Sequence, residues 1–194
     1  MPPPPPAPPS VTPDAPPRAL VSLTIGPRFG VPTNLAWGSA TLTAVVPFAG
    51  FTAGAFARVD TLSARIDGAP LSMNAIAVGV TAGRAFAPSP KVELRASLAP
   101  SLAVVSAKQG TSGGPVDETR VDGRIGVELR GALALSRLFR GVVAIDADLA
   151  PRELGGGGET TKPRDAGDQN HDGLTARFPA FTVGLGVGVE ITPR

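Results

Sequence analysis

The 194-residue chain contains no cysteine. Disulfide frameworks, thiolate metal sites, zinc fingers and cysteine nucleophiles are therefore excluded. It also has no run of about 18 or more uncharged apolar residues, which excludes a transmembrane helix. Only 18% of its residues are charged, and its Lys and Arg residues form no basic run interleaved with aromatics. No nucleic acid partner is expected, because such binding needs a concentrated basic patch.

Glycine (24) and proline (22) are both abundant. Much of the proline lies in residues 1–18, where it removes backbone donors and fixes φ. We predict a disordered, extended Pro-rich linker over residues 1–18, leading to a periplasmic domain or partner, with a tail that binds nothing as the alternative. One folded domain is predicted over residues 19–194.

From Ala19 onward, apolar and polar residues alternate with a period of two, which is typical of strands with one apolar face. The alternation is clearest over residues 92–107, where Leu94, Ala96 and Leu98 alternate with polar or small residues without interruption. Eight strands are predicted, over residues 19–31, 36–48, 51–63, 71–86, 92–107, 120–135, 139–150 and 177–192.

The predicted connections differ in length. Those at residues 49–50, 87–91 and 136–138 are short, whereas those at residues 108–119 and 151–176 are long. Short turns on one rim and long loops on the other are typical of a membrane barrel with periplasmic turns and extracellular loops. The predicted fold class is therefore all-β: an eight-stranded antiparallel up-and-down transmembrane β-barrel, with both termini on the periplasmic side.

Alternation alone does not distinguish a lipid-facing surface from the apolar interior of a lipocalin-like barrel. A strand face in contact with water would normally carry many Lys and Glu residues. Here all three lysines, Lys91, Lys108 and Lys162, lie at strand ends or in loops, so the polar faces are better suited to a lumen and the apolar faces to lipid. Small residues with scattered Arg, Asp and Glu suit a narrow lumen in which buried charges pair. Most of the runs also reach the roughly 9–11 residues that a tilted strand needs to cross a bilayer.

Most aromatic residues lie near predicted strand ends, which predicts two aromatic girdles at the membrane interfaces, with ordinary strand-end packing as the alternative. The girdle at the short turns comprises Phe48, Phe51, Phe86 and Phe139, and the one at the long loops comprises Phe29, Trp37, Phe178 and Phe181.

In strand number, girdles and loop asymmetry, the chain from Ala19 to its C-terminus resembles the OmpA-like class of small eight-stranded outer-membrane barrels. The resemblance is architectural and rests on no diagnostic motif, so no functional residue is carried over from that class. It implies location in the bacterial outer membrane, with membrane lipid as the first partner.

Charged residues of both signs fall on the predicted inward faces. They could form a selective ion path, since rings of charge select ions. A plug of ion pairs is favoured, because an eight-stranded lumen is only wide enough for side chains. The predicted lumen charges are Arg28, Arg58, Asp60, Glu93, Arg95, Asp122, Arg124, Glu128, Arg130, Arg140, Asp146, Asp148 and Glu190.

The last long loop contains a possible metal-binding pattern. Asp168, Asn170, Asp172 and Gly173 reproduce the D-x-N-x-D-G opening of an oxygen-rich calcium loop. The closing bidentate position falls on Pro179, so a complete EF-hand is not expected. A calcium site and a turn-rich polar loop remain the two interpretations, and no other cofactor is expected.

Catalysis is not expected. His171, the single histidine, lies in a loop rich in Gly and Asp, without a positioned nucleophile. The glycine run at residues 155–158 lacks the Lys-Ser/Thr of a phosphate loop. The sequence predicts a non-enzymatic outer-membrane barrel that acts as an anchor, envelope-structural element or loop-display scaffold. A narrow pore or small-solute channel is the alternative, and a soluble lipocalin-like binding barrel is the second.

Overall fold

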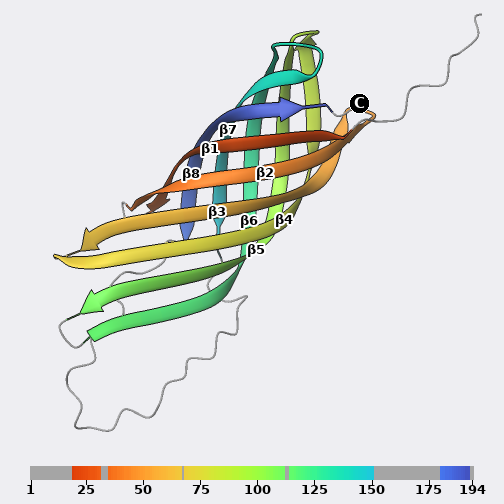
Figure 1. Cartoon of the computed structure of the whole chain (residues 1–194). Coiled ribbons are helices and arrows are strands. Elements are labelled where there is room, and N and C mark those ends of the chain that lie inside the picture. The colour runs from red at the N-terminus through yellow and green to blue at the C-terminus, as the bar shows by residue number, and fades with distance from the viewer. Residues whose placement is uncertain (1–18, 32–34, 67, 112–113, 151–179, 193–194) are drawn as a thin grey trace, which may run out of the picture.

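The computed structural model describes residues 19–31, 35–66, 68–111, 114–150 and 180–192. Each strand pairs antiparallel with its neighbours in the chain, and the first pairs with the last, so the sheet closes (Figure 1). This confirms the predicted closed, all-β, eight-stranded antiparallel barrel. The strands are β1 (Leu20–Val31), β2 (Ala36–Phe48), β3 (Phe51–Ile66), β4 (Ala69–Ser89), β5 (Val92–Thr111), β6 (Gly114–Ala134), β7 (Phe139–Leu149) and β8 (Phe181–Ile191).

Period-two alternation determines which side chains face the interior. In β8, Thr182 and Glu190 are each 1% exposed, whereas Leu185 and Val187 between them are 47% and 56% exposed. Closure also gives every strand two neighbours around the barrel, so backbone donors and acceptors there are paired across the sheet. Residues 62–66 of β3 and 114–124 of β6 extend past this ring and pair on one side only. Among the described residues, no helix is long and apolar enough to cross a membrane.

The four central strands β3 to β6 are longer than predicted. Residues 108–119, predicted as a long loop, are instead mostly paired strand, since Lys108 lies opposite Asp117 and pairing continues to Thr111 and Gly114. The prediction was wrong because alternation there continues in polar residues, which apolar periodicity does not detect. A Lys108–Asp117 ion pair of 3.3 Å lies across this hairpin. The β3–β4 hairpin likewise continues to Ile66 and Ala69.

The described turns at the opposite end are short, and the β2–β3 turn shows how such a turn sets the pairing of its strands. Phe48 pairs with Phe51, which leaves only Ala49 and Gly50 between the strands. Both have positive φ, at 48° and 79°. That combination is the type I′ geometry whose twist matches antiparallel strands, and it favours glycine. The turn therefore fixes the register of β2 against β3.

The interior contains an apolar cluster in its β3–β5 wall. It is formed by buried side chains that include Leu71 and Val105, both 2% exposed, and Trp37 packs against it. The assignment of Trp37 to an outward girdle was therefore wrong. Side chains of β2 alternate between the two faces, and Trp37 lies on the inward face with Ser39 and Thr41, despite its place near the strand end.

Strands β1 and β8 approach closely where the barrel closes. A Cβ atom at Gly188 would collide with the backbone oxygen of Leu23, and one at Gly26 would collide with the backbone oxygen of Leu185. The obstacles are backbone atoms, which cannot rotate away as a side chain can. Glycine at these two positions therefore allows the seam to close.

We predict that Gly188→Ala destabilises the barrel by roughly 1–3 kcal/mol, as overpacking does in well-packed interiors. Gly131→Ala is the matched control, because its added Cβ would lie 3.7 Å from Leu94 Cδ2, an ordinary contact. Urea unfolding of the two variants in detergent or lipid, followed by tryptophan fluorescence, measures the difference. Equal unfolding midpoints would contradict a tight β1–β8 seam.

Candidate functional site

The structure places all the predicted lumen charges on the inner wall of the barrel. Most are buried, and the others, Glu93, Asp122, Glu128, Arg140 and Asp146, are half-buried. They gather into a central group and a second group nearer the short turns. The buried members are Arg28, Arg58, Asp60, Arg95, Arg124, Arg130, Asp148 and Glu190.

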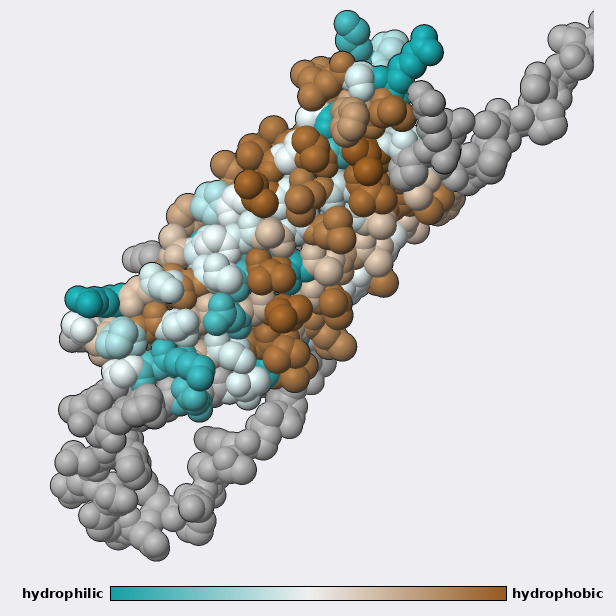
Figure 2. Space-filling view, in the orientation of Figure 1, coloured by the Kyte–Doolittle hydropathy of each residue, from teal (hydrophilic) through white to brown (hydrophobic). Residues whose placement is uncertain are grey.

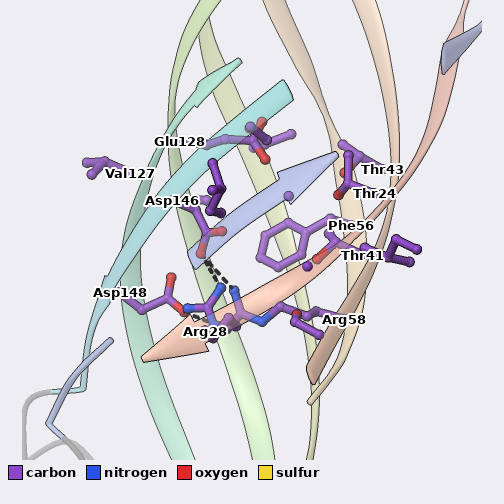
Figure 3. Close-up of a pocket in the computed structure, with 18 of the residues that line it drawn as sticks. Thr24, Arg28, Thr41, Thr43, Phe56, Arg58, Val127, Glu128, Asp146 and Asp148 are labelled. Carbon is purple, nitrogen blue, oxygen red and sulfur yellow. Dashed lines mark hydrogen bonds and ion pairs between the residues drawn. The ribbon is translucent and has the colours of Figure 1, made fainter. Parts of the chain in front are cut away.

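We define the central cluster as Arg28, Arg58, Asp60, Asp146 and Asp148. The guanidinium of Arg28, 1% exposed, pairs with Asp146 and donates to Asp148 Oδ2 at 2.6 Å (Figure 3). Arg58 reaches the same Oδ2 of Asp148 at 2.5 Å from β3 and donates through Nε to Asp60 at 3.2 Å. Asp148 thus joins strands β1, β3 and β7 across the interior.

Hydroxyl groups complete this arrangement. Arg28 also donates to Thr182 Oγ1 on β8 at 2.7 Å, and Thr182 is itself 1% exposed. The prediction of charged site residues did not include Thr182. The alternation of β8 places Thr182 on the inward face. That position is the sequence signal that could have identified it, because a polar side chain facing a charged lumen needs a partner.

Arg124 and Asp122 lie beside the central cluster. Arg124 is 6% exposed, and its Nη2 lies 3.6 Å from Asp122 Oδ2. Arg124 also lines a cavity of about 30 Å³ with Trp37 and Asp60. A second cavity, of about 40 Å³, lies against the central cluster. Both have the size of a few water molecules and are far below the roughly 300 Å³ of small-molecule pockets.

We define the turn-side cluster as Glu93, Arg95, Arg140 and Glu190, all near the short turns. Arg95 donates to Glu93 at 2.6 Å and to Glu190 at 2.9 Å. Arg140 donates to Glu93 at 2.7 Å and lies 3.4 Å from Glu190. Each cation therefore contacts both carboxylates, and strands β5, β7 and β8 are joined through side chains.

Arg130 forms a separate contact set between the two clusters. Its guanidinium binds Glu128 at 3.0 Å, Thr43 Oγ1 at 3.2 Å and the hydroxyl of Ser22. It thereby connects β6 with β2 and β1 across the lumen. Ser22 and Thr43, like Thr182, carry buried hydroxyl groups on the inward face. The predicted lumen residues, all of them charged, did not include them.

The charge arrangement on the inner wall can close the lumen. Cations and carboxylates alternate, so each charge is compensated locally, as a low-dielectric interior requires. Removing one partner of a buried ion pair costs about 3–5 kcal/mol, because the other charge is left without compensation. The inner wall is therefore expected to be rigid.

The predicted calcium ligands Asp168, Asn170 and Asp172, with the neighbouring His171, lie outside the described residues. Calcium binding there stays a prediction. Within the described ranges, no group of three or more His, Cys, Asp and Glu side chains is arranged to hold a metal ion.

The outer wall has the opposite character. Large apolar side chains are exposed along every strand, for example Ile76 at 59% and Leu129 at 60%. Figure 2 shows brown, apolar residues over the middle of the barrel and teal, polar residues toward its ends. Phe48, Phe51, Phe86, Phe139, Phe29 and Phe181 are also exposed, whereas Phe178 lies outside the described residues.

The apolar outer wall ends at one register row of the long strands. The last apolar residues are cross-strand partners: Val59, Ile76, Val104 and Val121. The next outward positions form a polar row, in which Ser106 and Thr119 share a hydrogen bond of 3.0 Å. That row is Thr61, Asn74, Ser106 and Thr119.

No family model matches the sequence, and no curated protein is similar to it in sequence. Solved structures are similar in fold. Neisserial surface protein A (NspA) has a TM-score of 0.58 at 9% identity, over 90% of this chain and 96% of that one. Ail, the attachment invasion locus protein of Yersinia pestis, has a TM-score of 0.55 at 10% identity, over 92% and 99%.

The N-terminal β-barrel domain of Pseudomonas aeruginosa OprF is also similar, with a TM-score of 0.51 at 11% identity, over 90% of this chain and 98% of that one. At such identities the likeness shows the fold. The chain has the fold of the small eight-stranded outer-membrane β-barrels, and the resemblance predicted from its sequence is confirmed.

Proposed function

We propose that this protein is a non-enzymatic β-barrel of the Gram-negative outer membrane with a lumen closed by ion pairs. The observation that carries the proposal is the distribution of polarity across the barrel wall. The outer wall exposes apolar side chains on every strand, and the inner wall holds the buried arginines and carboxylates. Lipid is the solvent that suits such an outer wall, and closure pairs each strand with two neighbours, as a lipid environment requires.

A soluble barrel of the lipocalin kind would have the opposite distribution. Its ligand cavity is apolar and its outer surface is polar. Here the central cavity is about 40 Å³ and is bordered by Arg28, Arg58, Asp146 and Asp148. The described part of the lumen therefore lacks the apolar cavity, and the described outer wall lacks the polar surface, that a soluble binding barrel needs.

Within this location, we propose a role as membrane anchor, envelope-structural element or loop-display scaffold. Residues 1–18 would extend into the periplasm toward a further domain or partner. The OprF barrel is described as an N-terminal domain, which supports the idea that such barrels serve as one part of a larger protein. The β3–β4 and β5–β6 hairpins, which continue beyond the apolar wall, would project outside.

The membrane location is tested by placing a charge on the outer wall. Val80 on β4 is 59% exposed, so Val80→Lys should be nearly neutral in a water-soluble barrel. In a bilayer we expect it to destabilise the folded barrel by about 2–4 kcal/mol. Unfolding in lipid vesicles measures the change, and Asn74→Lys, in the polar row of the same strand, should have little effect. A neutral Val80→Lys in a monodisperse, detergent-free monomer would contradict the location.

The orientation is tested by epitope accessibility. With eight crossings and short turns in the periplasm, both termini lie on the periplasmic side. An epitope inserted at Gly156 should be labelled on intact cells. One placed before Pro2 should be labelled only after the outer membrane is permeabilised. The reverse pattern, or equal labelling of both on intact cells, would contradict the orientation and the loop-display role.

A further inference from the structure

One arginine faces outward within the apolar outer wall. Among the described strand residues on the short-turn side of the Val59–Val121 row, Arg84 is the only charged residue at an outward position. It is exposed, and it lies on β4 opposite Phe51 of β3. All the other charged residues of this part of the strands face the lumen. A charge in an apolar wall is costly without a partner, so a partner of Arg84 is expected outside the barrel.

Arg84 is held by an aromatic pair. Its guanidinium carbon lies 4.8 Å from the centroid of the Phe51 ring, a cation–π contact. Phe51 stacks on Phe48 with ring centroids 6.1 Å apart. This contact holds the guanidinium over the ring. It uses none of the N–H groups as a hydrogen-bond donor to a lone pair, so they are available to an outside acceptor. On the other two sides, Ala82 of β4 and Ala96, the partner of Arg84 on β5, are too short to cover the guanidinium.

The adjoining turns carry the same sign of charge. Lys91 in the β4–β5 turn and Arg137 in the β6–β7 turn are both exposed. The turn residues 49–50, 90–91 and 135–138 contain no Asp or Glu. No ion pair within the described residues includes Arg84, Lys91 or Arg137, whereas the lumen arginines are paired. This rim is therefore positive and its charge is not neutralised by the described chain.

We propose that Arg84, stacked on Phe51, binds the phosphodiester of an anionic glycerophospholipid in the periplasmic leaflet, with Lys91 and Arg137 adding attraction from the rim. The proposal rests on the membrane location proposed above. The ligand must join a phosphate to acyl chains, because Arg84 lies at the end of the apolar wall between exposed Phe51 and Phe86. A guanidinium edge presents paired donors that match phosphate oxygens.

The experiment is native mass spectrometry of the full chain, folded in detergent, with dioleoylphosphatidylglycerol as the probe. Dioleoylphosphatidylcholine, which has the same phosphodiester but no net charge, is the comparison lipid. A cation near an anionic lipid surface contributes about 1 kcal/mol, so Arg84→Ala should weaken phosphatidylglycerol binding about fivefold. Phe51→Leu should weaken it about threefold, because the guanidinium loses its aromatic support.

Arg65→Ala is the matched control, since Arg65 is also exposed and outward on β3 but lies in the polar tip of the β3–β4 hairpin. It should leave binding unchanged. Equal binding of phosphatidylglycerol by the wild type and Arg84→Ala, or an equal loss in Arg65→Ala, would overturn the lipid site while leaving the membrane location intact. A wild-type chain that folds only without detergent or lipid would overturn both.

Discussion

Pairing of buried charge is the constraint on which the rest of this barrel depends. Eight strands enclose a lumen with room for side chains and little else. Each arginine of the lumen set on the described inner wall has a carboxylate within 3.6 Å. Asp148 accepts from both Arg28 and Arg58, and Glu190 contacts both Arg95 and Arg140. Because charge fills the interior, the apolar residues of these strands are left to form the outer wall.

The long strands change the polarity of both faces along their length. Beyond the Val59–Val121 row the outward positions become polar, and beyond the central cluster the inward positions become apolar, at Leu62, Leu71 and Val105. The polarity of the two faces is thus exchanged along β3 to β5. Such an exchange suits a sheet that leaves a lipid environment and continues into water, where an apolar cluster belongs on the covered face.

The positions of the strands, and which of their residues face inward, were predictable from sequence, because alternation over about ten residues separates the two faces of a strand. Which residues pair was not predictable, since Arg28 and Asp146 are 118 positions apart and meet only through the register of the closed sheet. The hairpin at residues 108–119 was missed because both of its faces are largely polar. Trp37 was placed on the wrong face because its position near the strand end was given more weight than its place in the alternation. Arg84 was overlooked because charged residues were expected only on the inward faces.

Planar-bilayer recording of the purified barrel tests the central claim most directly. If alternating ion pairs close the lumen, the wild-type protein inserts without forming stable channels. Arg124→Ala on the inner wall and Arg65→Ala on the outer hairpin should then both leave the baseline current unchanged. Stable, charge-selective channels whose conductance changes in Arg124→Ala but not in Arg65→Ala would contradict a closed lumen and indicate a pore.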